Sequence, residues 1–408
     1  MRTMPDRRRL LGGMGAALLC GGLNGCAAGG RATNGRRPAE GRPAEGRPAE
    51  GRYDKPPKLQ LAPILAQTDR ITRITVCTRP FRAEGPRLDV EVIGSKTIVH
   101  NYGHGGSGWS LSWGSSAIAV SKAMTTGERN IGVIGCGALG LTSALLLQRS
   151  GAEVTIYARE LPPNVRSTLA TGVWSPDSRI CLEENATPAF KQLWQGMARQ
   201  SFQTYQNYLG LPGTPVEFID SYYVSDGTQQ RRQPQSDSRP AFAELRRELI
   251  GDLMPEGVDI EPGSHNLGDR YLRRNSFMMF NLSAYMRMLV ADFTGNGGKF
   301  VIKEFHSPGD FAPLRERTLI HATGYGARAL FRDESLIPVR GQLARLIPQP
   351  EVLYGLFYKD VSFVPRRDGL VFQVVGDNDY YGFNDDSAVP DAAEAAHAVE
   401  TIAALFAA

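Results

Sequence analysis

The stretch NIGVIGCGALGLTSALLLQRSGAEVTIYA, residues 130–158, decides the fold of this 408-residue chain. An apolar strand at Ile131–Ile134 runs into the glycine pattern Gly135-x-Gly137-x-x-Gly140. A helix is expected next, followed by a second strand at Val154–Tyr157, and the inward-facing residues of that helix are Leu139, Ala144, Leu145 and Leu147. This strand–turn–helix–strand order is typical of a dinucleotide-binding βαβ unit.

Each glycine of the pattern has a separate task. Gly135 permits the tight turn, Gly137 lets the backbone approach a pyrophosphate, and Gly140 lets the helix pack on the sheet. The helix begins at Ala138 and Leu139, where free N–H groups and the helix dipole favour an anion.

The acid that usually ends the second strand and binds ribose hydroxyls is absent. Ala158 stands there, and Arg159 follows it. An arginine at this point is suited to a 2′-phosphate, so an NADP-dependent reductase stays an alternative, as does a plain surface charge.

Composition indicates a globular protein, with 42% hydrophobic and 22% charged residues. The net charge of +4 arises at the N-terminus, because residues 1–52 hold 10 arginines and 4 acids and the rest of the chain carries −2. Nothing in the folded part indicates nucleic-acid binding. The five cysteines show no CxxC or Cys/His spacing, so we expect neither a disulfide nor a metal site.

The N-terminal extension resembles an export signal. Arg7-Arg8-Arg9 precedes a short, weakly apolar run to Leu23, which predicts twin-arginine export, with a disordered basic tail as the alternative. Leu23–Cys26 is similar to a lipoprotein box, in which Cys26 would be lipidated and anchor the protein to a membrane. We therefore expect a periplasmic or lipid-anchored protein, or a cytoplasmic one if the signal is not used. Three PAEGR units at residues 38–52 predict a linker.

The residues from 154 onward resemble the D-amino acid oxidase family of FAD-dependent oxidoreductases. The similarity is carried by VTIYARELPPNVRSTLATGVWSPDSR at 154–179, by LIHATGYGARAL at 319–330 and by PVRGQ at 338–342. The resemblance implies that FAD is held by the fingerprint and by Ala158, Arg159, Ser167, Thr168, Thr171, Gly172, Val173, Phe305, Thr323 and Gly324.

Two further family segments stand upstream of the fingerprint instead of at the C-terminus. TRPFR at 78–82 is similar to the family's R-P-x-R segment, and HNYGHGGSGWSLSWG at 100–114 is similar to its glycine-rich C-terminal turn. We therefore interpret the order as circularly permuted, since a separate domain of about 65 residues would bury little core.

The upstream turn is expected to open a helix over 109–124 whose N–H groups face the flavin. The residues implied for this contact are Gly105, Gly106, Ser107, Gly108 and Trp109. Arg79 is expected to bind the substrate carboxylate through two prongs. His100 and His104 are expected to shape the loop and not to act as acid or base.

The resemblance weakens in the lid region. Ser362 stands where the family has a carboxylate-binding tyrosine, and Tyr358 stands where some members carry a lid tyrosine. The resemblance therefore implies Arg79, Tyr358 and Ser362 as the candidate catalytic residues. Val374–Asp386 departs from the family pattern, which predicts a wetter, more acidic pocket.

We expect an α/β fold with a Rossmann-type FAD-binding domain and an intertwined α+β substrate domain on an antiparallel or mixed sheet. The expected segments are a signal at 1–26, a linker at 27–60, permuted pieces at 61–124, the FAD-binding βαβ unit at 125–180, substrate domain at 181–300, an FAD-binding return at 301–335, and substrate domain with lid at 336–408. The resemblance implies oxidation of the amine carbon of a D-amino acid or related amine by hydride transfer to flavin N5, with oxygen or a respiratory quinone as acceptor. A non-catalytic flavin-binding envelope lipoprotein is the remaining alternative.

Overall fold

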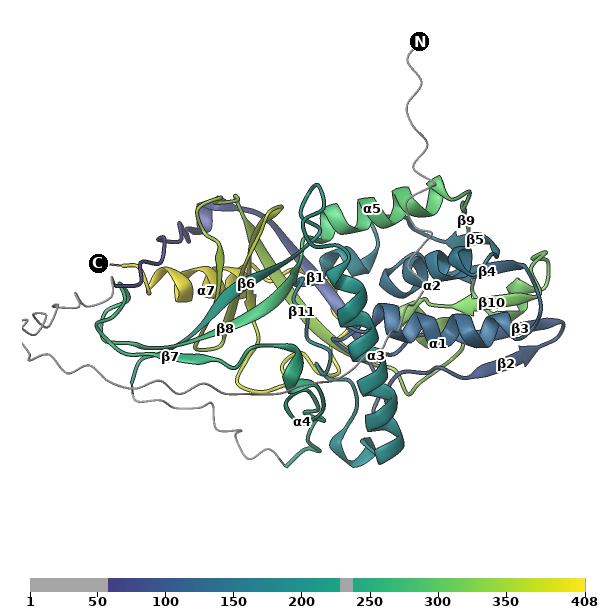
Figure 1. Ribbon diagram of the computed structural model, residues 1–408, viewed down its shortest axis with the longest axis horizontal. Helices are drawn as coiled ribbons and strands as arrows, with labels where there is room; N and C mark the ends of the chain where they lie inside the picture. Colours follow the sequence, from purple (N-terminus) through teal and green to yellow (C-terminus); the bar gives the residue numbers. More distant parts are fainter. Residues whose placement is uncertain (1–57, 228–237, 408) are drawn as a thin grey trace, which may run out of the picture. The chain divides into compact units, whose positions relative to one another are not determined.

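Two β-sheets carry the fold in the computed structural model, which describes residues 58–227 and 238–407. One has the strand order β2-β3-β10-β4-β5-β9 and the other the order β1-β11-β14-β13-β12-β6-β8-β7. Figure 1 shows α1, α2 and α5 with the first sheet, on the right, and α7 with the second, on the left. The expected α/β class with a second, mixed sheet is confirmed.

The six-stranded sheet is the Rossmann-type layer. All its strand pairs are parallel except β2 with β3. Its strands are β2 (Val90–Ile93), β3 (Lys96–His100), β4 (Asn130–Ile134), β5 (Glu153–Ala158), β9 (Lys299–Ile302) and β10 (Thr318–His321). β10 pairs with β3 on one side and with β4 on the other, so the upstream segment and the fingerprint share one sheet.

Three helices pack together beside this sheet. They are α1 (Ser112–Met124), α2 (Ala138–Arg149) and α5 (Leu282–Gly295), and α3 (Pro188–Gln206) packs on α1. The residues of α2 predicted to face inward are buried: Leu139, Ala144, Leu145 and Leu147. Gly151 follows the C-cap of α2, and its φ of 83° is the left-handed conformation that commonly ends helices.

The eight-stranded sheet is antiparallel except for β12 with β6. Its strands are β1 (Ile71–Phe81), β6 (Val216–Ser225), β7 (Val258–Ile260), β8 (Tyr271–Phe280), β11 (Ile337–Leu346), β12 (Tyr354–Tyr358), β13 (Val361–Arg366) and β14 (Gly369–Val374). α7 (Ala392–Ala403) and residues 61–66 close one face with a core that includes Leu61, Ile64, Ala398 and Leu405. The two short helices α4 (Arg246–Ile250) and α6 (Ala327–Leu330) complete the α-helices of the described residues.

The folded unit begins slightly before the expected boundary. Leu59, placed in the predicted linker, donates its N–H to the carbonyl of Ser264 at 2.8 Å. The predicted signal, Cys26 and the PAEGR units lie outside the described residues. Among the helices that the structure describes, none is long and apolar enough to cross a membrane.

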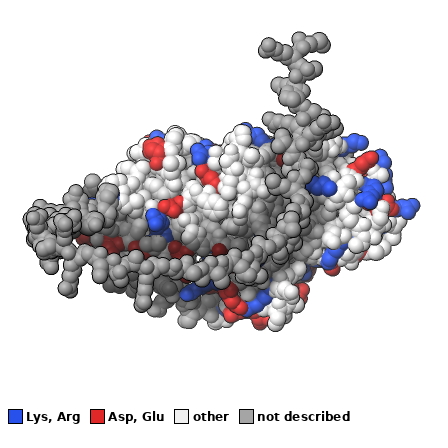
Figure 2. All heavy atoms as spheres, in the orientation of Figure 1, with Lys and Arg blue, Asp and Glu red and all other residues white. Residues whose placement is uncertain are grey.

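Figure 2 shows basic and acidic side chains interspersed over the visible part of the described surface. This mixed pattern agrees with the near-neutral charge of the sequence after residue 52.

Residues 61–124 contribute to both sheets and form no unit of their own. β1 is the edge strand of the eight-stranded sheet, and β3 lies inside the six-stranded one. This arrangement is compatible with a permuted chain order, which stays a prediction.

The permuted order is testable with a re-permuted chain. New termini are opened at Gly127, in the turn after α1, and Ala407 is joined to Lys58 by a short Gly/Ser linker, because Leu61 and Leu405 share one core. We expect this variant to keep the flavin absorption and to melt within a few degrees of the unpermuted chain starting at residue 58. Failure to fold, while the unpermuted control folds, contradicts the prediction.

Candidate functional site

A cavity of about 680 Å³ brings together segments from the whole described chain. Among its lining residues are most of those predicted from the sequence: Arg79, Gly105, Gly106, Gly108, Trp109, Gly135, Gly137, Ala138, Leu139, Ala158, Arg159, Ser167, Thr171, Gly172, Val173, Phe305, Thr323, Gly324 and Ser362. The two glycine-rich turns therefore border one cavity and not two.

The fingerprint has the close contacts that its glycines were expected to permit. A Cβ on Gly140 would lie 2.1 Å from the carbonyl oxygen of Gly135, so the helix approaches the turn backbone directly. A Cβ on Gly137 would lie 2.7 Å from Oγ of Ser167, which accepts the N–H of Ala138 at 3.0 Å. The first turn of α2 holds no acidic residue, and its N-terminus borders the cavity. This cradle fits a phosphate group.

Three predicted cofactor residues lie behind the wall. Gly140 packs within α2, Ser107 donates its hydroxyl to the carbonyl of Ser178 at 3.1 Å, and Thr168 donates to the carbonyl of Val165 at 2.7 Å. None of the three is among the residues that line the cavity.

One end of the cavity lies beside the residues that follow the paired strands β5 and β9. Ala158, Phe305 and Glu304 line it there, and Arg159 forms ion pairs with Glu304 at 3.2 Å and Glu160 at 3.8 Å. Two carboxylates beside Arg159 lower its capacity to receive a 2′-phosphate. The structure thus gives no support to the NADP alternative, and Glu304, two residues after β9, places a carboxylate beside the end of β5.

The upstream turn differs from expectation in its donors. The N–H of Gly105 binds the carbonyl of Pro80 at 2.9 Å, and the N–H of Gly106 binds the carbonyl of Ser178 at 2.9 Å. The helix begins at Ser112 and not at Trp109. The donors of Gly105 and Gly106 therefore tie the turn to its neighbours and are not aimed at a ligand. The side chain of Trp109 instead reaches the carbonyl of Ser167 at 2.8 Å.

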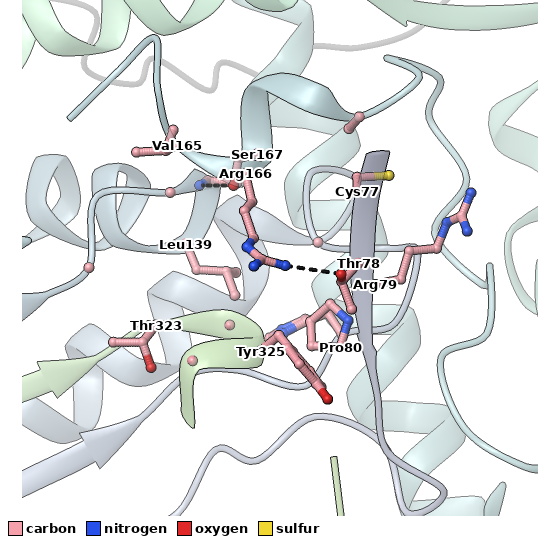
Figure 3. A pocket seen from close by; sticks show the side chains of 18 of the residues that line it. Cys77, Thr78, Arg79, Pro80, Leu139, Val165, Arg166, Ser167, Thr323 and Tyr325 are labelled. Atoms are coloured by element: carbon pink, nitrogen blue, oxygen red, sulfur yellow. Dashed lines mark hydrogen bonds between the residues drawn. The ribbon is translucent and has the colours of Figure 1, made fainter. Parts of the chain in front are cut away.

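Arg79 lies on β1 against the backbone of β11. Its Nη1 donates to the carbonyl of Arg340 at 2.9 Å, and a Cβ on Gly341 would lie 2.5 Å from its Nη2. Figure 3 shows Arg79 and Cys77 extending from one side of β1, while Thr78 and Pro80 face the other. Because Gly341 of the PVRGQ stretch has no side chain, the Arg79 guanidinium can lie directly against its backbone.

Tyr358 does not reach the cavity, although a role in catalysis was expected for it. β12 and β13 join through a two-residue turn that pairs Phe357 with Ser362 and Tyr358 with Val361. Ser362 lines the cavity, so Tyr358 occupies the opposite face, where its hydroxyl donates to Asp226 at 2.5 Å. Two residues that are four apart, such as Tyr358 and Ser362, share a sheet face only when they lie in one continuous strand. Here the turn lies between them, so they face opposite sides of the sheet.

Among the lining residues that the sequence analysis did not predict are three polar ones, Arg166, Gln373 and Arg179. Arg166 extends from beside Ser167 to Oγ1 of Thr78 at 2.9 Å (Figure 3), and Oε1 of Gln373 accepts the hydroxyl of Thr171 at 2.5 Å. Arg179 is buried at a φ of 49° and pairs with Asp379 at 3.3 Å. Arg166 could have been found from its place beside the hydroxyl residues Ser167 and Thr168. Gln373 reaches the cavity through strand pairing and Arg179 through an unusual backbone conformation, and neither has a signature in the sequence.

The expectation of an acidic pocket is wrong for the described residues. The 374–386 stretch contributes Val375 to the lining, and its acids are not among the lining residues. Asp379 turns toward Arg179, and the cavity lining carries Arg79, Arg159, Arg166, Arg179 and Lys303 against Glu160 and Glu304. Its wall is therefore cationic.

A buried arginine supports the loop at Thr171–Val173. Nη1 of Arg366 donates to the carbonyl of Ala170 at 2.8 Å, and its Nη2 pairs with Asp368 at 2.6 Å. Burial opposes ionisation of Asp368, yet the charge and hydrogen bonds of Arg366 outweigh it and lower the pKa of Asp368. Burial, with the nearby charge of Arg366, also lowers the pKa of Arg345 to about 10.

The titratable groups beside the upstream turn and the fingerprint are neutral at physiological pH. Burial lowers the pKa of His104 to about 3 and raises the pKa of the Cys136 thiol to about 12. With a pKa this low, His104 is a poor proton acceptor at neutral pH, in line with the sequence interpretation.

Comparison with known proteins assigns the family. Residues 130–408 match the sequence model described as "DAO: FAD dependent oxidoreductase". The chain belongs to this family. Its members use FAD as cofactor.

Among curated proteins, the chain is 26% identical to a D-amino-acid oxidase of Dictyostelium discoideum over 52% of this chain and 56% of that one. A D-amino-acid oxidase of Streptomyces coelicolor is 26% identical over 67% of this chain and 76% of that one. The chain thus spans little more than half the length of the first of these relatives. Among solved structures, iminodiacetate oxidase from Chelativorans sp. BNC1 is similar with a TM-score of 0.45 and 16% identity, over 68% of this chain and 79% of that chain.

The cradle at Gly137 yields a test of where the cofactor binds. Gly137→Ala places a methyl group against Ser167, and we expect FAD affinity to fall roughly 10- to 100-fold. The matched control is Gly196→Ala, in the exposed part of α3 with nothing within 4 Å, which we expect to keep FAD. Flavin fluorescence titration of the apoprotein measures both. Equal affinities for the two variants contradict the assignment.

Proposed function

We propose that this chain oxidises the amine carbon of a D-amino acid or related amine, using FAD bound in the cavity. Support comes from one observation above the rest. Arg79 lines the same cavity as the fingerprint and is held over Gly341 by its bond to Arg340.

The cofactor position follows from the donors and the charges. The end of the cavity between β5 and β9 suits an adenosine, the N-terminus of α2 with Arg166 suits the pyrophosphate, and the loop Thr171–Val173 then borders the flavin. When bound, FAD supplies a two-electron acceptor for the carbon–hydrogen bond of the substrate.

The substrate carboxylate would lie on the sheet face that carries Arg79. A guanidinium presents two parallel N–H donors to a carboxylate, a geometry that lysine lacks. Ser362 and Gln373 are paired across β13 and β14 and line the cavity, so they bound the same space. Fixing the carboxylate orients the α-carbon, and positioning then supplies much of the rate enhancement.

The wall favours a polar substrate. Ser362 in place of an aromatic leaves room, and Gln373 and the buried Arg179 add polar groups. An apolar side chain placed here would displace water from this polar wall without offering it hydrogen bonds, which is costly in a buried site. D-Aspartate, glycine and iminodiacetate are therefore ranked above D-phenylalanine.

The decisive measurement is anaerobic mixing of the FAD-loaded protein with these amines. We expect bleaching of the flavin absorption by at least one polar amine carboxylate. Arg79→Ala should lower kcat/KM for it by roughly 10- to 100-fold, mainly through KM, while FAD stays bound. Arg73→Ala, on the exposed part of the same strand, is the control.

Two outcomes count against the proposal. No bleaching by any amine supports the non-catalytic alternative, and unchanged kinetics of Arg79→Ala remove Arg79 from the substrate site. Loss of FAD in Arg79→Ala would make that residue part of the cofactor site instead.

We also propose that the chain is exported with its cofactor and retained in the cell envelope. The arginines at 7–9 and Cys26 support this, because a twin-arginine route carries folded proteins. Replacing the three arginines by lysines should hold the protein in the cytoplasm, whereas Cys26→Ser should leave export intact and release the protein from membranes. Arg31→Lys is the control, and immunoblots of cell fractions are the measurement. Unchanged fractionation of both variants refutes the proposal.

A further inference from the structure

A chain of hydrogen bonds runs from the molecular surface to the wall of the cavity. Oε2 of Glu91 lies 3.0 Å from Nε2 of His100, and Nδ1 of His100 lies 3.0 Å from Nδ1 of His321. Nε2 of His321 lies 2.6 Å from Oγ1 of Thr323, which lines the cavity. Both imidazoles are 0% exposed, while the side chain of Glu91 is 38% exposed.

The two histidines meet because β3 and β10 are parallel and in register. The pairs Ile98 with Leu319 and Val99 with Ile320 are apolar, and His100 with His321 ends the row. Phe331 stacks on His321 with ring centroids 4.4 Å apart, and Tyr102 meets both imidazoles edge-on. Two polar rings so enclosed cost free energy unless all their nitrogens are bonded, and here all four are.

Both imidazoles are neutral. Burial lowers the pKa of His100, with the positive Arg87 acting in the same direction against Glu91 and Asp89. Burial, followed by His100 and Arg87, lowers the pKa of His321 well below its ordinary value. The remaining charged or titratable groups of this cluster are Tyr102 and Asp333, which bond each other at 2.7 Å.

Because both rings are neutral, every hydrogen bond from Glu91 to Thr323 must point in the same direction. A carboxylate only accepts, so Nε2 of His100 carries its proton toward Glu91, and Nδ1 of His100 must accept. His321 then donates through Nδ1, its Nε2 accepts, and the proton between His321 and Thr323 belongs to the Thr323 hydroxyl. The Glu91 carboxylate thus fixes the direction in which the Thr323 hydroxyl, in the cavity wall, donates its proton.

We propose that Glu91, His100 and His321 are positioning residues that hold the hydroxyl proton of Thr323 toward His321 and leave its oxygen as a hydrogen-bond acceptor for FAD. The group it accepts from is a hydroxyl or N–H of the cofactor, not a phosphate oxygen. Because the rings protonate only below the usual range of histidine, the order persists throughout neutral pH.

Nitrogen NMR of the FAD-loaded protein with ¹⁵N-labelled histidine tests the order directly, since ¹⁵N shifts separate protonated from unprotonated ring nitrogens. We expect His100 to carry its proton on Nε2 and His321 on Nδ1, unchanged between pH 6.5 and 8. Histidine-to-glutamine variants of the two assign the signals. Protons on Nδ1 of His100 and Nε2 of His321, or an imidazolium at either position, overturn the proposal.

FAD affinity tests the consequence. Thr323→Val removes the acceptor and should weaken FAD binding roughly 2- to 10-fold, whereas Thr323→Ser should retain it. Glu91→Gln offers either a donor or an acceptor to His100, so the order is no longer fixed; we expect weaker FAD binding and a second histidine tautomer in the spectrum. Asp89→Asn is the matched control, because the Asp89 side chain bonds Arg87 and not the His100 ring, while its backbone bond to the His100 N–H is kept.

Unchanged FAD affinity in Thr323→Val, or equal effects of Glu91→Gln and Asp89→Asn, refutes the positioning role. The inference rests on FAD as cofactor and not on the proposed substrate. Failure of every amine to bleach the flavin would therefore leave these measurements intact.

Discussion

The site depends on the central place of β10 in the six-stranded sheet. β10 pairs with residues 97–100 of β3 on one side and with residues 131–134 of β4 on the other. β3 precedes α1 in the sequence and β4 follows it, yet the carboxyl ends of both strands lie at the same edge of the sheet. In a parallel sheet the carboxyl ends of the strands are where ligands bind. The glycine fingerprint follows β4, the turn at residues 322–324 follows β10, and the upstream glycine turn follows β3. Removing β3 would expose β10 and disconnect the upstream turn from the cavity.

β1 links this edge to the second sheet. It pairs with β11 along its length, from Ile71 to Phe81, and its Pro80 carbonyl accepts the N–H of Gly105. The strand that carries Arg79 is therefore bonded both to β11 of the eight-stranded sheet and to the upstream glycine turn. Such double fixation would hold Arg79, the proposed carboxylate-binding residue, within the narrow tolerances that catalysis by positioning demands.

Sequence reasoning succeeded where the chemistry is local. The glycines at 135, 137 and 140 specify a turn and a close contact by themselves, so their position, the helix after them and the cavity wall followed directly. It failed where pairing decides. Tyr358 moved to the far face because a two-residue turn reverses the alternation between β12 and β13. The N–H groups of Gly105 and Gly106 were taken by Pro80 and Ser178, which come from distant segments, and Arg179 and Gln373 join the wall only through tertiary contacts.

The polar interior beside the cavity bears on how rigid its wall is. Asn101, Ser115 and His104 form a second buried chain, with 2.6 Å from Ser115 to Asn101 and 2.7 Å from His104 to Ser115. Apolar residues would fill this space at lower desolvation cost, since Nδ1 of His104 is buried without a hydrogen-bond partner among the described residues. The bonds that do form add directional constraints that apolar packing lacks. Together with the His100–His321 pair, this chain fixes both strand ends from behind. The wall that meets the cofactor is thus held by oriented hydrogen bonds as well as by packing, and its dipoles need little rearrangement when charge changes in the cavity.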